Sequence, residues 1–195
     1  MIRIGVLALQ GDFLEHIQVL KAIGVEASEV RLPDHLDGLT GLIIPGGEST
    51  SIVKLADLYG LREAIRKAVG RGMAVWGTCA GMIVIARELE NDRPEPFGLL
   101  DVKVSRNWFG RQIDSFEQNL RIKGLEGDPY HCVFIRAPAF TSLGPDVETL
   151  AAIDDGTPVA VRSGKMMATA FHPELTDDVR IHKMFLRLAD SDAGS

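Results

Sequence analysis

The first half of the 195-residue chain alternates between apolar segments and stretches with helical periodicity. Four short segments predict strands, over residues 2–9, 25–31, 41–47 and 72–77. Between the first two, apolar residues recur at positions 13, 14, 17, 20 and 23 and predict a helix, which Gly24 ends. Further helices are expected over about 50–70 and from Ala80 to Leu89. Strands that alternate with helices in this way indicate a parallel sheet covered on both faces.

The pattern changes after residue 96. Short strand-like segments follow one another, at residues 98–104, 131–137, 147–153, 158–163 and 165–171, and predict antiparallel additions at one edge of the sheet. The stretch from Asp177 to Leu188 is helical again, with an apolar stripe through Ile181 and Phe185. The fold class predicted is α/β: a three-layer sandwich with a mainly parallel central sheet and antiparallel strands at one edge. Residues 1–195 are expected to form a single domain.

Composition narrows the class of function. A net charge of −6 argues against binding to nucleic acid or to an anionic membrane, since both need basic surfaces. No apolar run approaches the roughly 20 residues of a membrane span, and the apolar start is interpreted as a strand rather than a signal peptide. Two cysteines, Cys79 and Cys132, are too few for a disulfide framework. A cytoplasmic location is therefore expected.

Residues 77–81 carry the strongest candidate chemistry. The segment reads G-T-C-A-G and lies between a predicted strand and a predicted helix. That is the cysteine form of a nucleophile elbow, in which a sharp turn exposes the nucleophile and small neighbours let the turn close. A thiolate at Cys79 would be stabilised by the start of the helix, and the Ala80 N–H would face a developing oxyanion. The alternative is a buried structural cysteine beside a glycine-rich turn.

A cysteine nucleophile needs a base, and His172 is the favoured one. It ends a strand-like segment and is followed by Pro173 and Glu174. In an extended segment residues i and i+2 face the same way, so Glu174 can orient the imidazole. An ordinary turn after an edge strand is the alternative. The other four histidines are assigned elsewhere: His16 and His182 to solvated helix surfaces, His35 to a polar loop, and His131 to a cap or strand edge.

A second glycine motif, P-G-G-E-S, follows the third predicted strand. Gly46 and Gly47 let backbone N–H groups approach a ligand closely. The motif lacks the Lys-Ser/Thr ending of a phosphate loop. It can equally be a turn that caps the next helix, with Ser49 or Thr50 as the N-cap.

Two arginines lie at predicted strand ends in the second half of the chain. Arg106 and Arg136 can each grip a carboxylate through a bidentate fork. Each can equally belong to a surface ion pair.

Taken together, G-T-C-A-G and the late H-P-E resemble the class I, triad-type glutamine amidotransferases. Within that family, the chain is similar to the glutaminase subunits of pyridoxal 5′-phosphate synthases. The similarity rests on six stretches: L-A-L-Q-G-D-F-L-E-H (7–16), L-I-I-P-G-G-E-S-T (42–50), G-T-C-A-G-M (77–82), R-N-W-F-G-R-Q-I-D-S-F-E (106–117), V-F-I-R-A-P (133–138) and A-T-A-F-H-P-E-L-T-D-D (168–178).

The resemblance implies a flavodoxin-like fold and a role for each matching residue. Cys79 attacks the side-chain amide of glutamine, His172 moves the protons, and Glu174 orients His172. Gly47 and Ala80 supply the oxyanion N–H groups. The glutamine pocket is formed by Gly47, Glu48, Ser49, Arg106, Ile135 and Arg136, with Gln10 near its mouth.

The resemblance also implies hydrolysis of L-glutamine to glutamate and ammonia, without a cofactor or metal ion. The ammonia would pass to a partner synthase subunit in a hetero-oligomer that makes pyridoxal 5′-phosphate. Three alternatives stay open: an elbow-cysteine protease or carbonyl-repair enzyme, a γ-glutamyl peptide hydrolase, and a scaffold with a fossil site. Enzymes of the first kind typically have histidine after the nucleophile, where this chain has Ala80.

Overall fold

A central sheet of seven strands organises the chain in the computed structural model, which describes residues 1–91, 93–106 and 115–190. The strand order is β10-β11-β12-β4-β3-β1-β2. Five neighbouring strands are parallel: β12 (Met166–Thr169), β4 (Ala74–Thr78), β3 (Gly41–Ile44), β1 (Arg3–Leu7) and β2 (Glu26–Val30). Strands β10 (Glu148–Ala152) and β11 (Pro158–Ser163) add antiparallel pairings at one edge. The predicted fold class is confirmed.

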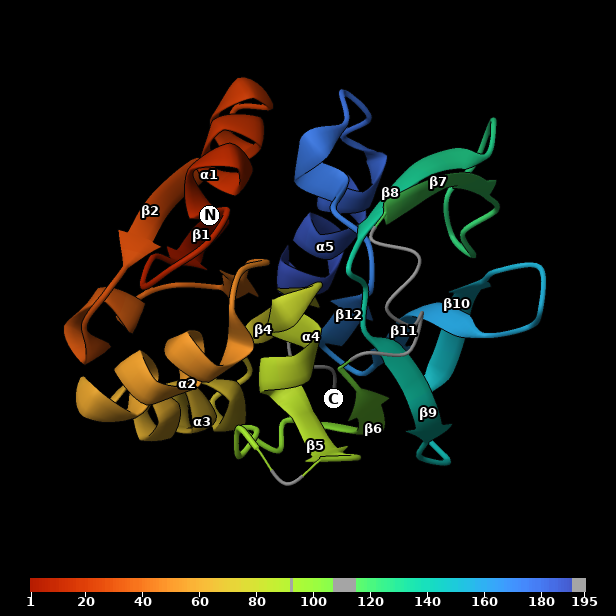
Figure 1. The fold of residues 1–195 in the computed structure, drawn as a ribbon. Coiled ribbons are helices and arrows are strands. Elements are labelled where there is room, and N and C mark those ends of the chain that lie inside the picture. The colour runs from red at the N-terminus through yellow and green to blue at the C-terminus, as the bar shows by residue number, and fades with distance from the viewer. Residues whose placement is uncertain (92, 107–114, 191–195) are drawn as a thin grey trace.

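Helices cover both faces of this sheet (Figure 1). Helices α1 (Phe13–Ala22) and α5 (Arg180–Asp190) lie on one face, and α2 (Ser49–Leu58), α3 (Leu61–Gly70) and α4 (Ala80–Ile85) on the other. The helical region expected over about 50–70 consists of two helices, which separate where Gly60 adopts a left-handed conformation with φ 72°. The helix expected to reach Leu89 ends at Ile85, and the chain continues as β5 (Ala86–Leu89).

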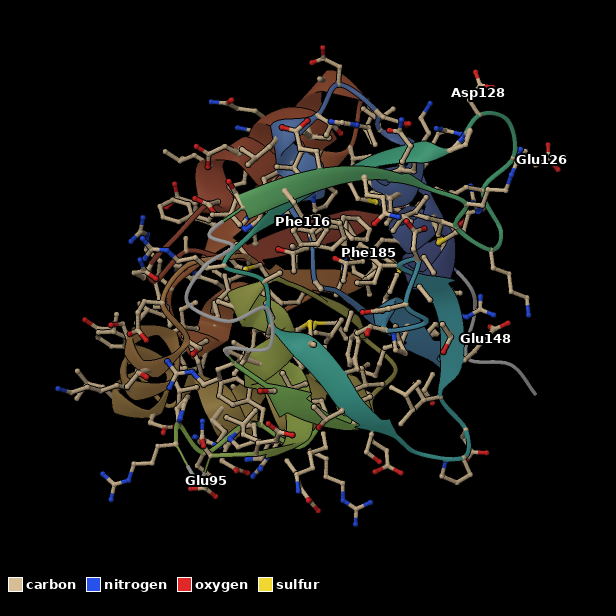
Figure 2. All side chains as sticks on the ribbon, turned by 45° about the vertical axis from the view of Figure 1, so that its right-hand side comes forward. Glu95, Phe116, Glu126, Asp128, Glu148 and Phe185 are labelled. Carbon is tan, nitrogen blue, oxygen red and sulfur yellow. The ribbon has the colours of Figure 1, made fainter. Side chains whose placement is uncertain are left out.

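Two smaller sheets pack beside the central one, and β12 pairs parallel with β4 inside the central sheet. The expectation that all later strands add antiparallel at one edge was therefore wrong. One contains β5, β6 (Leu100–Ser105) and β9 (Ala139–Leu143), and the other pairs β7 (Ser115–Leu120) with β8 (Tyr130–Ile135). Apolar side chains explain the β7–β8 ribbon, since Phe116 stacks on Phe134 with ring centroids 4.4 Å apart. Figure 2 shows Phe116 turned inward, whereas Glu126 and Asp128 point outward at the ribbon's loop.

Buried β4 is the middle strand of the seven. All five of its residues are buried, and Trp76 is fully enclosed against α5 through Phe185, with ring centroids 5.6 Å apart. Within the described ranges, no helix is long and apolar enough to cross a membrane.

The strand order indicates at which edge of the sheet a ligand would bind. From β1 the chain passes to β2 on one side, whereas β3 pairs with the other side of β1. Ligands of open α/β sheets bind beyond the carboxyl ends of the strands at such a switch point. The segments that follow β1, β3, β4 and β12 meet at this edge, and they contain the candidate motifs.

Candidate active site

Cys79 lies at the turn between β4 and α4 in a strained backbone conformation, with φ 48° and ψ −108°. The strain is possible because both flanking glycines lack a side chain. A Cβ on Gly81 would stand 1.9 Å from the Ile44 carbonyl oxygen, and one on Gly77 would stand 2.5 Å from Gly81. The residues after the turn are buried from Ala80 onward. The structure therefore has the elbow geometry that the G-T-C-A-G sequence predicts.

His172 and Glu174 form a buried pair at the end of the neighbouring strand β12. The His172 backbone N–H donates to the Val133 carbonyl at 2.8 Å, and the short 3-10 helix η2 (Pro173–Leu175) follows. His172 Nδ1 lies 2.6 Å from Glu174 Oε1. Burial lowers the pKa of His172, but its interactions with Cys79 and Glu174 outweigh burial and raise the pKa to about 10. An imidazolium is thus favoured beside the Cys79 sulfur and the Glu174 carboxyl group.

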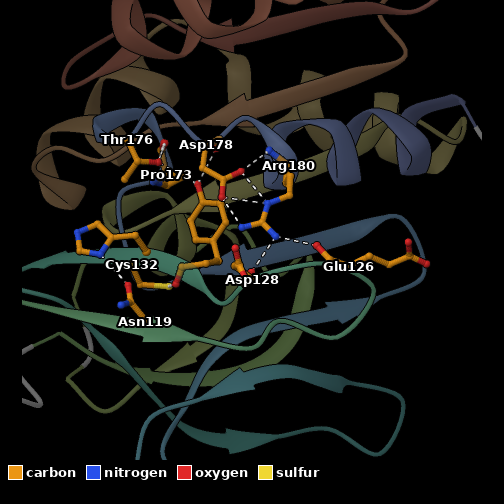
Figure 3. A network of polar contacts seen from close by, with 10 residues as sticks. Asn119, Glu126, Asp128, Cys132, Pro173, Thr176, Asp178 and Arg180 are labelled. Carbon is orange, nitrogen blue, oxygen red and sulfur yellow. Dashed lines mark hydrogen bonds and ion pairs between the residues drawn. The ribbon is translucent and has the colours of Figure 1, made fainter.

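A polar network fixes the chain just after this pair (Figure 3). The Tyr130 hydroxyl lies 3.2 Å from Thr176 Oγ1 and donates to the Asp178 carbonyl at 3.0 Å. The Arg180 guanidinium pairs with the Asp178 carboxylate and donates to the Glu126 and Asp128 carbonyls at 2.7 and 2.8 Å. These bonds join the start of α5 to the β7–β8 ribbon, so both ends of the segment that carries Glu174 are held.

Backbone carbonyl groups contact Cys79 at both its N–H group and its sulfur. The Cys79 N–H donates to the Thr169 carbonyl at 2.8 Å, and Sγ lies 3.8 Å from the Ile135 carbonyl oxygen. The next residue, Arg136, has φ 45°, a conformation rarely adopted by a residue with a side chain. Strain of this kind persists where surrounding structure enforces it, and it gathers at functional sites. Ile135, which the resemblance assigns to the pocket, is therefore brought to the cysteine through its carbonyl group.

The glycine motif after β3 is tied to the loop after β1. The Asp12 N–H donates to the Gly46 carbonyl at 3.0 Å, and the Glu48 N–H donates to Gln10 Oε1 at 2.6 Å. Gly47 has φ 151°, which favours glycine. A Cβ on Gly46 would stand 2.7 Å from the His172 ring, so the absence of a side chain lets the imidazole approach this backbone. Gln10 therefore lies against the glycine motif.

Glu48 is the N-cap of α2, so the assignment of that cap to Ser49 or Thr50 was wrong. The Glu48 carboxylate accepts hydrogen bonds from the Thr50 and Ser51 N–H groups at 3.0 and 2.7 Å. Burial raises the pKa of Glu48, but hydrogen bonds from Ser51 and Thr50 together outweigh burial and lower the pKa. Ser49 is buried in the first turn of the helix.

Arg106 reaches Glu48 from the second half of the chain. Its guanidinium lies 3.4 Å from Glu48 Oε1 and donates to the Arg93 carbonyl at 3.1 Å. The rest of its motif, residues 107–114, lies outside the described residues. Arg136 is exposed. Arg106 is therefore placed at the glycine motif, whereas Arg136 directly follows the residue whose carbonyl lies beside the cysteine.

Two histidines assigned to solvated surfaces are fully buried, which corrects that prediction. His16 Nε2 lies 3.3 Å from Thr78 Oγ1 and 3.4 Å from Glu174 Oε2, and His16 Nδ1 lies 3.1 Å from His182 Nε2. The sequence contained a signal of this burial, because residues three apart share a face of a helix. His16 follows Phe13 by three residues, and His182 precedes Phe185 by three, so each histidine lies on an apolar face.

Asp12 is a further residue that the sequence reasoning did not single out. Its Oδ2 lies 3.6 Å from His172 Nδ1, and burial is the main reason why its pKa is raised. Asp12, His172 and Glu174 each offer one atom that could ligate a metal, and these atoms lie within 4.8 Å of one another. A metal ion there would have to replace the 2.6 Å contact between His172 and Glu174. The arrangement is better suited to holding an imidazole for proton transfer.

A family model described as the SNO glutamine amidotransferase family matches residues 6–191. The chain belongs to this family. It is thereby a glutamine amidotransferase, as the sequence resemblance predicts. Two curated relatives are both called pyridoxal 5′-phosphate synthase subunit PdxT. The one from Thermus thermophilus is 56% identical, covering 95% of this chain and 97% of the relative. The one from Herpetosiphon aurantiacus is 53% identical, covering 95% and 99%.

Solved structures agree with this placement. One described as a glutamine amidotransferase superposes with a TM-score of 0.91 at 52% identity, covering 96% of this chain and 99% of that chain. The PurLQS structure from Thermotoga maritima superposes with a TM-score of 0.73 at 19% identity, covering 95% and 98%. At that identity only the fold is shared.

Proposed function

We propose that the chain hydrolyses L-glutamine to L-glutamate and ammonia through Cys79, His172 and Glu174. The observation that carries this is the pairing of a strained elbow cysteine with a buried His172–Glu174 contact of 2.6 Å. Membership of a glutamine amidotransferase family supports glutamine as the substrate. Residues 1–195 would act as one glutaminase domain.

In the first half-reaction the Cys79 thiolate attacks the carbonyl carbon of the glutamine side chain. The carbon–nitrogen bond then breaks while the His172 imidazolium donates its Nε2 proton to the leaving nitrogen, which departs as ammonia. A γ-glutamyl thioester remains on Cys79. Glu174 keeps its charge and stabilises the imidazolium through Nδ1.

Water completes the cycle. His172, now neutral, takes a proton from water as its oxygen attacks the thioester carbon. The carbon–sulfur bond breaks, glutamate leaves, and Cys79 returns to its thiolate beside an imidazolium. Both tetrahedral intermediates carry an oxyanion, for which we assign the Gly47 and Ala80 N–H groups as donors.

The pocket proposed for glutamine surrounds the elbow. Glu48, Arg106 and the backbone at Ile135 stand next to the glycine motif or the sulfur. Glutamine carries an α-amino and an α-carboxylate group, and a carboxylate side chain beside a guanidinium offers a partner to each. The remaining members assigned to the pocket are Gly47, Ser49 and Arg136, with Gln10 at its mouth.

The ammonia is proposed to pass to a synthase subunit. The curated relatives are named as subunits of pyridoxal 5′-phosphate synthase, which supports a hetero-oligomer and a role in vitamin B6 synthesis. Ammonia released into water is protonated and loses its nucleophilicity, so direct delivery gives the glutaminase a reason to bind its consumer.

Partner binding is proposed to complete the site through the Gly46–Gly47 peptide. In this peptide the Gly46 carbonyl is held by the Asp12 N–H at 3.0 Å, in the loop that also carries Gln10. A partner that contacts this loop can alter that bond and turn the Gly47 N–H. One oxyanion donor is worth about 10²–10³ in rate. Titration of purified synthase subunit into the chain should raise glutamate formation; an isolated chain that already works at the complexed rate would refute the gating.

Labelling with a diazo-ketone analogue of glutamine tests the assignment of the nucleophile. The chain with its synthase subunit should be alkylated at Cys79, and glutamine should protect it. Cys132 is an internal control, because burial raises the pKa of its thiol to about 12 and keeps it protonated. Peptide mass mapping that finds the label on Cys132, or equal labelling with glutamine present, would refute the proposal.

A further inference from the structure

Glu174 is buried, but its two carboxylate oxygens differ in their contacts. Oε1 lies 2.6 Å from His172 Nδ1. Oε2 has no hydrogen-bond partner within the described part of the chain, and His16 Nε2 lies 3.4 Å away from it. Leaving a buried carboxylate oxygen without a donor is costly, so the nearby imidazole nitrogen is its natural partner.

His16 stands between Glu174 and a second imidazole. Its Nδ1 lies 3.1 Å from His182 Nε2, and its Nε2 also lies 3.3 Å from Thr78 Oγ1. Both rings pack against the edge or face of Trp76, with centroid distances of 5.7 Å for His16 and 5.0 Å for His182. Trp76 and Thr78 are two residues apart on β4 and so project from the same face of the sheet.

The contacts determine where the protons are. His182 Nδ1 is buried and has no partner among the described residues, so a proton there would be an unsatisfied donor. The His182 proton therefore lies on Nε2 and is donated to His16 Nδ1. His16 then carries its own proton on Nε2, which faces Glu174 Oε2 and Thr78 Oγ1. Burial lowers the pKa of His16 well below its usual value and that of His182 to about 4, so both rings are neutral at pH 7.

We propose that His16 is a positioning residue for Glu174, and that His182 sets the tautomer of His16. The chain of donors runs from His182 to His16 to Glu174 Oε2, and the other carboxylate oxygen accepts a hydrogen bond from His172 Nδ1. With both oxygens held, the carboxylate cannot rotate away from His172. A neutral donor at His16 also leaves the full negative charge of Glu174 to interact with the His172 imidazolium. An arginine or lysine in place of His16 would neutralise that charge.

This inference rests on the proposed glutaminase function, and substitutions at His16 test it in the chain supplied with its synthase subunit. In His16→Gln the amide nitrogen reaches the place of Nε2 and can still donate to Glu174. In His16→Asn the side chain reaches only the place of Nδ1, and His16→Leu has neither group. We expect kcat to fall about tenfold to a hundredfold in the last two and at most about threefold in His16→Gln. The KM for glutamine should stay unchanged in all three.

His35→Asn is the matched control, because His35 is an exposed histidine whose ring accepts from the Arg31 N–H at 3.3 Å, away from Glu174. Thermal unfolding of each variant reports whether the fold is kept. Equal kcat for His16→Gln and His16→Asn, or a change in KM rather than kcat, would overturn the positioning role. A wild-type chain without glutaminase activity would instead refute the proposed function itself.

Nitrogen-15 spectra of histidine-labelled wild-type chain test the proton arrangement without any substitution. Both His16 and His182 should be neutral at pH 7 and carry their proton on Nε2. A proton on Nδ1 of either ring, or an imidazolium at His16, would overturn the inference even if the variants failed to fold.

Discussion

The groups assigned to the chemistry and those assigned to substrate binding differ in how they are held. The His172–Glu174 pair lies inside the protein, with side-chain exposures of 7% and 0%. The Arg106–Glu48 pair lies at the rim, with exposures of 30% and 50% and a separation of 3.4 Å. The first is supported by buried rings on α1 and α5, the second by loops and the first turn of α2.

The difference has a physical consequence. Charges in the interior interact strongly with one another, and water cannot take the place of a missing partner. Each buried charge therefore depends on its neighbours. Charges at the rim are screened and contribute less, but they can rearrange as a ligand or partner binds. Proton transfer needs the first kind of environment, and binding and regulation can use the second.

The largest effect is expected for Cys79→Ala, which removes the proposed nucleophile beside the buried His172–Glu174 pair. Glutamine hydrolysis in the presence of the synthase subunit should fall by several orders of magnitude, because the members of such a triad act as a unit. The fold should persist, since the side chain is small. Glutamate formation near the wild-type rate, with contaminating glutaminase excluded, would mean that another group is the nucleophile.

His172→Ala should reduce kcat more than Glu174→Gln. The imidazole moves both protons, whereas the carboxylate orients it and stabilises its charge. Steady-state kinetics of the two variants at saturating glutamine rank them. A fully active His172→Ala protein would mean that another residue is the base. The next candidate to substitute would be His131, an exposed histidine that pairs with Glu117 at 2.8 Å.

Gly11→Ala disturbs the contact between the loop after β1 and the Gly46–Gly47 backbone, which lies between the buried His172–Glu174 pair and the exposed Arg106–Glu48 pair. A Cβ there would stand 1.8 Å from the Gly46 carbonyl oxygen, and Gly11 has φ 96°. The free energy of unfolding should fall by at least about 2 kcal/mol, from the clash together with the backbone strain. Gly24→Ala is the control, because Gly24 also has positive φ but its Cβ would meet nothing within 4 Å. Urea unfolding that gives equal losses would show that strain alone is responsible.

Arg106→Ala tests the rim. It should raise the KM for glutamine about tenfold to a hundredfold and change kcat little, because a charge-assisted contact to substrate is worth about 1.5–3 kcal/mol. Arg87→Ala removes a surface arginine that pairs with Asp101 at 2.8 Å, and it should leave KM unchanged. An unchanged KM together with lost binding of the synthase subunit would make Arg106 an interface residue instead.

The last prediction is a pH dependence of stability. The folded pKa of His172, about 10, lies above its ordinary value of 6.5. Its stabilising contribution is therefore complete below pH 6.5 and is lost as pH rises toward 10. Urea unfolding from pH 7 to 10 should show a decline that is smaller in His172→Gln. An identical decline in both proteins would show that His172 is not the titrating group.

The sequence by itself determined much of the architecture. Alternating apolar runs and helical periodicity predicted four of the five parallel strands and the helices α1 and α5, because local burial patterns repeat with the geometry of each element. The fifth, β12, was expected as an antiparallel edge strand but pairs parallel with β4. The elbow could be predicted as well, since G-T-C-A-G combines a nucleophile with the two glycines that a sharp turn needs. The H-P-E segment at a strand end favoured His172 as the base for Cys79, and the resemblance to amidotransferases supplied the roles of both residues.

Only the tertiary structure decided the environment of those groups. Helical spacing places His16 and His182 on faces shared with apolar residues, but whether a histidine there is buried depends on what packs over it. Sequence-distant helices α1 and α5 bring the two rings together beside Glu174. The cap of α2 and the separation of β5 and β7 from the central sheet were likewise decided only in the structure. The buried histidines and the separate sheets follow from contacts between residues far apart in the chain, which no local periodicity encodes. The cap of α2 is local, but the sequence offers Glu48, Ser49 and Thr50 side by side, and only the structure shows which of them accepts from the helix N–H groups.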